Sequence, residues 1–145
     1  MAAQVKHGTF RVSKAEAIKF ADDIRVLKAV DPTLGLYAAY AYRDGGDIDQ
    51  VCDLLGFMLG DLKGHPLLDV ALLARGGPKG CSPDITKAVP FCPMLMRGWS
   101  MFLAESTVPS VVREAAEHLV PALWTTFDDE GMRLLGEAMN TGELS

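Results

Sequence analysis

The sequence contains little cysteine. Cys52, Cys81 and Cys92 are the only three in 145 residues, and no two of them form a close pair. Small secreted domains more often carry an even number of cysteines arranged as a disulfide framework. The odd number and the wide spacing therefore weigh against such a framework, and they favour a reducing, cytoplasmic setting.

Long hydrophobic runs are also missing. The longest apolar candidate, residues 67–74, is interrupted by Asp69, whereas a membrane-spanning helix needs about 20 mostly apolar residues. The first residues of the chain show no apolar core of the kind that marks a signal peptide. We therefore expect no membrane insertion.

The basic residues form no cluster. The formal net charge is −5, and the lysines and arginines are scattered along the chain. Nucleic-acid-binding proteins usually present a concentrated basic surface, so we expect no nucleic-acid partner. The sequence also has no HExxH, no CxxC, no acidic calcium loop and no glycine-rich phosphate loop. We expect neither a metal nor another cofactor.

What the sequence does contain is a regular series of helix signals. Hydrophobic residues make up 49% of the chain, enough for a substantial core. Proline opens several apolar segments and glycine follows them, as is typical of helix starts and ends. The signals predict a capped amphipathic helix from Ser13 and further helices over residues 32–45, 47–64, 66–74, 93–105, 109–127 (kinked or split at Pro121) and 128–142.

These signals predict an all-α fold. We expect a compact bundle or short solenoid of about six to seven helices, built from antiparallel helical hairpins. Pro32 and Pro66 lie 34 residues apart, the length of a tetratricopeptide repeat, but no third copy follows, so only a TPR-like hairpin is expected. Residues 1–12 are expected to be a flexible lead-in and residues 13–145 a single helical domain, interrupted by a long irregular loop over residues 76–90.

Two segments are candidate contact surfaces. The loop at 76–90 contains three prolines, and its Cys81 is expected to be the most exposed cysteine. The segment 93–102 is rich in methionine and aromatic residues, a composition found both at adaptable binding surfaces and in helix cores. We favour the core interpretation for this segment, with an exposed edge at Arg97; its candidate residues are Met94, Met96, Arg97 and Trp99.

Cys92 is the sharpest catalytic candidate, because a thiolate beside an imidazole forms a nucleophile. Its apolar neighbours instead indicate a buried thiol, and no histidine can be placed beside it from the sequence. We therefore assign no catalytic residue. The alternative is a small enzyme or ligand sensor with a pocket between two helices, lined by Tyr37, Tyr40, Cys92, Arg97 and Trp99.

Several blocks of sequence resemble a helical accessory segment of multidomain bacterial proteins. The blocks are residues 26–42 (VLKAVDPTLGLYAAYAY), 69–74 (DVALLA), 90–95 (PFCPML) with Gly98-Trp99, and 123–127 (LWTTF). Such segments accompany caspase-like peptidase or other effector domains, and no catalytic residue is carried over from them. The resemblance implies a module that binds or positions another protein.

The sequence thus predicts a non-catalytic, helical protein-interaction or regulatory module. Its partner would be another protein, an effector domain or a second copy of the chain, as for a bacterial cytoplasmic adaptor. A small ligand belongs to the alternative prediction, in which the five residues named above line a pocket.

Overall fold

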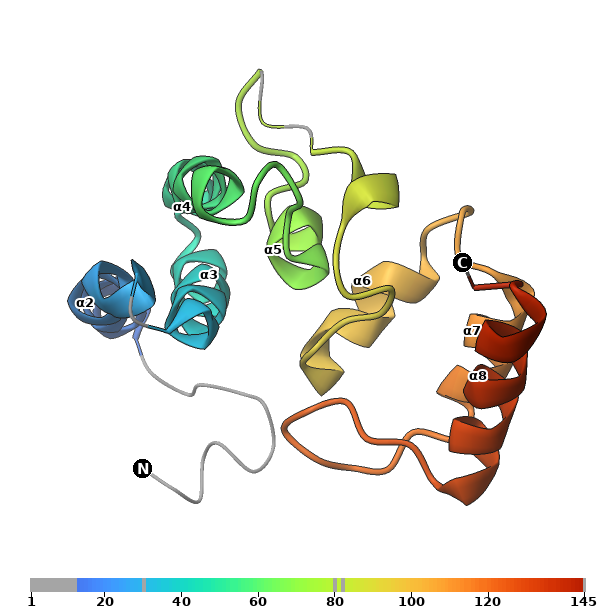
Figure 1. Cartoon of the computed structure of the whole chain (residues 1–145). Helices are drawn as coiled ribbons and strands as arrows, with labels where there is room; N and C mark the ends of the chain where they lie inside the picture. The colour runs from blue at the N-terminus through green and yellow to red at the C-terminus, as the bar shows by residue number, and fades with distance from the viewer. Residues whose placement is uncertain (1–12, 30, 80, 82, 145) are drawn as a thin grey trace. The chain divides into compact units, whose positions relative to one another are not determined.

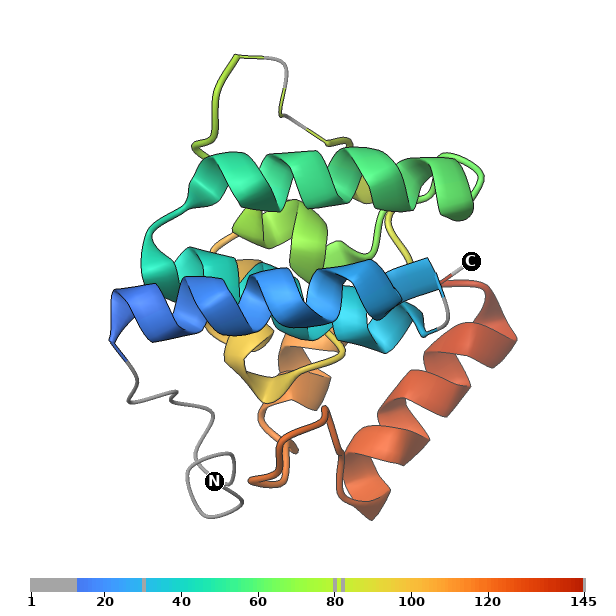
Figure 2. The same ribbon diagram turned by 90° about the vertical axis from the view of Figure 1, so that its left-hand side faces the viewer.

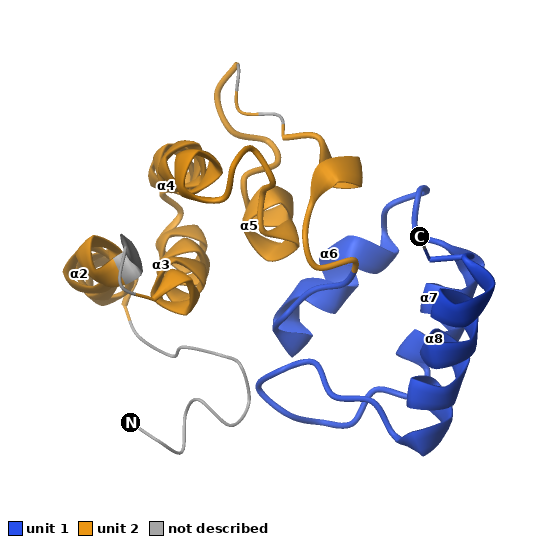
Figure 3. Cartoon of the chain, in the orientation of Figure 1, with its two compact units in different colours: residues 1–8, 92–145 blue, residues 9–91 orange. Residues whose placement is uncertain are grey.

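A computed structural model describes residues 13–29, 31–79, 81 and 83–144, and their regular secondary structure is helical (Figure 1). Their regular elements are seven α-helices and three short 3₁₀ helices, with isolated bridges in place of strands. The predicted all-α fold is confirmed. The described residues before Cys92 form one compact unit and those from Cys92 onward form another (Figure 3). The range expected to form a single domain, residues 13–145, includes both units. The expected lead-in, residues 1–12, lies outside the described residues.

The first unit begins with α2 (Lys14–Arg25), which continues into the 3₁₀ helix η1 (Val26–Ala29). The predicted capping box is confirmed: the Ser13 hydroxyl accepts a hydrogen bond from the Glu16 amide, and the Glu16 carboxylate accepts one from the Ser13 amide. These two bonds satisfy amide groups that the first helical turn leaves without partners. Local chemistry therefore sets where this helix starts.

Helix α3 (Pro32–Gly45) is the centre of this unit. Asp31 caps its first turn through the Thr33 amide, and Gly46 ends it with a φ of +79°, a conformation that favours glycine. The helix is buried from Gly35 onward on almost every side and packs against α2, α4 and α5, as its apolar sequence predicts. A side chain in place of Gly45 would meet Ile18 of α2 at 2.5 Å, so glycine permits this close approach.

Helices α4 (Ile48–Asp61) and α5 (Leu68–Leu73) complete this unit. Figure 2 shows α3 and α4 running in opposite directions, as predicted for a helical hairpin. Helix α5 is shorter than the predicted 66–74 helix, because Leu67 instead forms a backbone bridge with Val89. The described residues of the following loop are irregular, as expected, except for the 3₁₀ helix η2 (Ile85–Lys87).

The second unit contains the 3₁₀ helix η3 (Met96–Gly98) and helices α6 (Trp99–Leu103), α7 (Ser110–Ala116) and α8 (Asp129–Thr141). The last helix follows the prediction closely, since Asp128 caps its start and Gly142 ends it with a φ of +79°. Helices α7 and α8 pack together. The buried residues of this unit include Trp99, Phe102, Val112, Ala115, Leu135 and Ala138.

Two predicted helices of the second unit are wrong in extent. Pro93 and Met94 are not helical, and helix α7 ends at Ala116 rather than near Phe127. Both segments use their backbone groups for pairing instead: Leu95 bridges Trp124, and Leu119 bridges Phe127. Pro121 lacks the amide hydrogen that a helix interior requires, which favours this extended turn over a kinked helix.

A buried hydrogen bond connects α3 to α5. The Tyr40 hydroxyl donates to Oδ1 of Asp69 at 2.7 Å, and both residues are almost fully buried. Burial of a carboxyl group is unfavourable unless it forms hydrogen bonds, so this contact offsets part of the cost of placing Asp69 in the core. The pair thereby fixes α5 on the surface of α3.

We expect Tyr40→Phe to lower the free energy of unfolding by about 1 to 3 kcal/mol, because it removes a hydrogen bond to a buried carboxyl group. Urea unfolding followed by circular dichroism measures this change. A double-mutant cycle with Asp69→Asn provides the control, since the two substitutions should be strongly non-additive. Additive effects would show that the two side chains contribute independently.

Candidate functional site

Trp99, one of the candidate contact residues of the segment 93–102, is a core residue. Its side chain is 3% exposed, and its ring packs edge-on against Phe102 and Phe127. The indole N–H donates to the Thr125 hydroxyl at 2.8 Å, and that hydroxyl donates to the Pro93 carbonyl at 2.6 Å. The core interpretation of this segment is therefore confirmed for Trp99, whose only polar group is already hydrogen-bonded.

The neighbouring candidates lie at the edge of that core. Met94, Met96 and Arg97 are half-buried, and Cys92 is buried at 8% exposure. The predicted burial of Cys92 is confirmed, and it lies outside the disulfide described below. The expected edge at Arg97 is thus partly accessible, while the cysteine is shielded from reagents in solution.

We expect Thr125→Val to destabilise the protein by about 1 to 3 kcal/mol, because the buried indole N–H of Trp99 loses its acceptor. Thr126→Val is the matched control: its hydroxyl is exposed and bonds only to the nearby Trp124 carbonyl, so its effect should stay within about 0.5 kcal/mol. Chemical unfolding monitored by near-ultraviolet circular dichroism compares the two. Equal effects would contradict the role assigned to Thr125.

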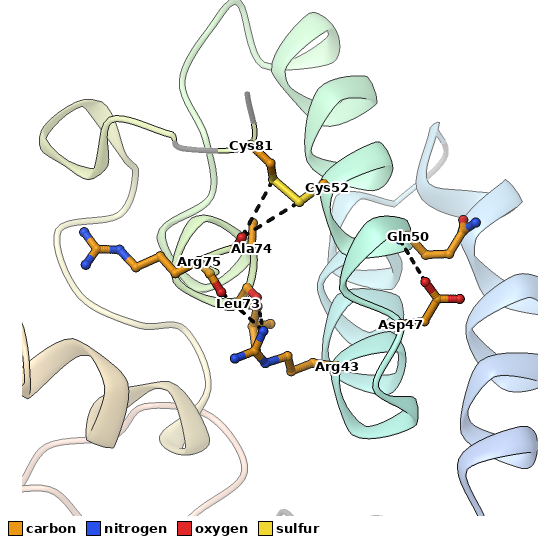
Figure 4. Close-up of a disulfide and its surroundings, with 8 residues drawn as sticks. All are labelled: Arg43, Asp47, Gln50, Cys52, Leu73, Ala74, Arg75 and Cys81. Atoms are coloured by element: carbon orange, nitrogen blue, oxygen red, sulfur yellow. Dashed lines mark hydrogen bonds between the residues drawn. A yellow bond between two sulfur atoms is a disulfide. The ribbon is translucent and has the colours of Figure 1, made fainter. Parts of the chain in front are cut away.

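Cys81 forms a disulfide with Cys52 of α4, and the sequence-based expectation for these cysteines is wrong (Figure 4). The two are 29 residues apart, and their Cα atoms lie 5.8 Å from each other. Cys52 and Cys81 are both half-buried. A side chain on Gly77 would meet the Cys52 sulfur at 2.5 Å, so only glycine fits beside the bridge. The cysteines therefore give no support to a reducing compartment.

Breaking this disulfide should destabilise the first unit. Closing a loop with a sequence separation of 29 stabilises the folded state by about 3 to 4 kcal/mol in the chain-entropy model. We expect Cys81→Ser to lose about this amount under oxidising conditions, measured by urea unfolding. Dithiothreitol should lower the stability of the wild type equally and leave the variant unchanged. A wild type that is indifferent to dithiothreitol would contradict the prediction.

The residues of the predicted pocket fall in the two different units. Tyr37 and Tyr40 belong to α3, whereas Cys92, Arg97 and Trp99 belong to the second unit. Tyr40 directs its hydroxyl to Asp69 within its own unit. Tyr37 is half-buried, and burial is the main cause that raises the pKa of its hydroxyl. The pocket stays a prediction.

One acid–histidine pair was not identified from the sequence. The His118 ring nitrogen Nδ1 lies 3.1 Å from Oδ2 of Asp128, and Oδ1 of the same carboxylate accepts a hydrogen bond from the Gly131 amide. The Gly131 amide first, and His118 second, hold the pKa of the Asp128 carboxyl below its ordinary value. Because the Asp128 amide also donates to the His118 carbonyl, the pair closes the turn at the start of α8. Its geometry is that of a helix cap.

The described residues contain neither a metal-binding cluster nor a helix suited to a membrane. No group of three or more histidine, cysteine, aspartate or glutamate side chains among them is arranged to hold a metal ion. Over the same residues, no helix combines the length and the apolar character that crossing a bilayer requires.

The outer face of α4 is an unpredicted feature of the first unit. Phe57 is 58% exposed there, although α4 buries Val51, Leu54, Leu55 and Met58 on its other side. Gly56 and Gly60 flank it and are exposed, and a side chain added at either would meet nothing within 4 Å. The helical periodicity could have shown that Phe57 lies off the buried face. We call Gly56, Phe57 and Gly60, with the exposed Asp49 and Asp53, the α4 outer face.

Comparisons with known protein families, with curated protein sequences and with solved structures each found no match.

Proposed function

We propose that this chain is a non-catalytic protein-interaction module whose α4 outer face binds a helix of a partner protein. One observation carries the proposal: a large aromatic side chain, Phe57, is 58% exposed on a well-formed helix between two glycines. Aromatic residues are frequent anchors of protein interfaces. The exposed part of the ring lies beside two positions that carry no side chain, so apolar groups of a partner have room to pack there.

The two glycines support the same conclusion. Glycine inside a helix is less stable than alanine by about 0.5 to 1 kcal/mol, because it loses more conformational freedom on folding. At Gly56 and Gly60 there is open space for a side chain, so nothing inside the described part of the chain requires glycine there. Residues without side chains do, however, allow a second helix to approach closely. The resemblance to an accessory segment that positions other proteins agrees with this role.

The alternative function, a small-molecule pocket, has no comparable support. The hydroxyl of Tyr40 and the indole nitrogen of Trp99 are both used in hydrogen bonds within their own units. The interaction module is therefore the function proposed for this chain.

If the proposal is correct, replacing the two glycines by alanine should raise the stability of the chain but weaken its binding to the partner. The double variant Gly56→Ala, Gly60→Ala should be more stable than the wild type by about 1 to 2 kcal/mol in urea unfolding. Gly136→Ala in α8 is the matched control, because that glycine also has no atom within 4 Å of an added side chain. Both proteins should gain stability, but only the α4 variant should lose binding to the partner.

A photo-crosslinking amino acid in place of Phe57 identifies that partner in cells that naturally express the chain. The same group at Met132, which is 60% exposed on α8, is the control position. We expect a discrete adduct from position 57 only, and at least a tenfold weaker affinity of the purified adduct partner for the α4 double variant and for Phe57→Ala. Identical adducts from both positions, or an affinity that these variants do not change, would overturn the proposed function.

A further inference from the structure

The charges of the α4 outer face specify the kind of helix that fits it. Asp49, Asp53, Gly56 and Gly60 follow one another at spacings of four, three and four residues, so they lie along one face of the helix. Phe57 is adjacent to this row, and all five residues are exposed. The face is therefore acidic over its first two turns, and aromatic and open over the following turns.

The two aspartates have no ionic partner within the described part of the chain. No described side chain forms a salt bridge with Asp49 or Asp53, and α4 itself contains no lysine or arginine. Ion pairs do form on other helices, as between Asp23 and Lys19 and between Glu130 and Arg133. The acidic charge of this face is thus available to a partner.

Local helix stability does not account for Asp53. An acidic residue in the first turn is favoured by the helix dipole, which explains Asp49, but the effect fades beyond that turn. Aspartate is also a poor residue for a helix interior. Asp53 therefore costs the isolated chain some stability, and its position beside Gly56 places its charge at the edge of the open surface.

The same charges decide between possible occupants. A second copy bound through this face would add the same two aspartates and no positive side chain, since α4 contains no lysine or arginine, so it would give them no ionic partner. Nucleic acids and anionic lipids are disfavoured for the same reason. A helix with positive residues has the complementary charge, and a small or apolar face on that helix fits against Phe57 and the glycines.

We propose that the α4 outer face binds a basic amphipathic helix of a partner protein. Two lysines or arginines of that helix, one turn apart, pair with Asp49 and Asp53. Its small and apolar residues pack on Gly56, Phe57 and Gly60. This inference rests on the proposed function, and it adds the partner's charge and the order of its residues along the helix.

A display selection tests this inference with the full chain. The probe is a library of alanine-based helical peptides of 18 residues, in which the positions of one face vary among lysine, glutamate, leucine and alanine. We expect enrichment of two lysines three or four residues apart, next to leucine or alanine. The best peptide is then synthesised, and its Kd is measured at about 50 and 300 mM salt, where exposed charge pairs are screened differently.

Charge-matched variants separate specific pairing from the overall charge of the chain. Asp49→Asn with Asp53→Asn should weaken the selected peptide by about five- to tenfold and remove most of its salt dependence. Glu114→Gln with Glu117→Gln removes the same charge from exposed positions on and just after α7, and it should leave the affinity within about twofold. Circular dichroism of each variant verifies that it is folded.

Each other outcome contradicts a defined part of the proposals. Enrichment of leucine without lysine would overturn the inference that the partner helix is basic, and so would equal effects of the two charge variants. If Phe57→Ala still abolishes binding in either case, the α4 outer face remains a binding surface. Selected peptides that bind Phe57→Ala normally count against the proposed function as well. A selection that enriches no peptide over the unselected library overturns both.

Discussion

The buried hydrogen bond between Tyr40 and Asp69 is the polar contact that positions α5 on α3 in the first unit. All six residues of α5 are buried, including the carboxyl group of Asp69, and a buried carboxyl group requires hydrogen bonds. Tyr40 supplies one from the middle of α3, a helix that is itself covered by α2, α4 and α5. The position of α5 on α3 is therefore set by one polar contact as well as by apolar packing. The loop that follows α5 therefore begins from a helix whose position on α3 is set.

The short helices are held by bonds from distant residues rather than by their own sequences. Helices of five or six residues are not stable alone, because nucleation is unfavourable. The guanidinium of Arg43 in α3 donates to the carbonyls of Leu73 and Arg75 at the end of α5. Arg113 of α7 does the same for the carbonyls of Leu103 and Glu105 after α6. Each arginine satisfies carbonyl groups that a helix end leaves without partners.

The features that could be predicted from the sequence are those determined by neighbouring residues. The helix starts at Ser13, Asp31, Asp47 and Asp128 follow from side chains that bond amides two or three positions later. The bridge between Leu95 and Trp124 could not be predicted, because it joins backbone segments 29 residues apart. The disulfide between Cys52 and Cys81 could not be predicted for the same reason, because the two cysteines come together only after α4, α5 and the loop are in place. The position of Phe57 off the buried face of α4, by contrast, follows from the helical periodicity and could have been predicted.

The α4 outer face concentrates several features that lower the stability of an isolated helix. On α2 and α8, side-chain caps stand at the helix starts, and ion pairs join exposed residues, as between Lys19 and Asp23 and between Arg133 and Glu137. On α4, two interior glycines, an exposed aromatic ring and an aspartate beyond the first turn all occur on one side. Each lowers the stability of the isolated helix. Natural sequences accept such local conflicts mainly at functional sites, so their concentration on one face is itself evidence for a binding surface.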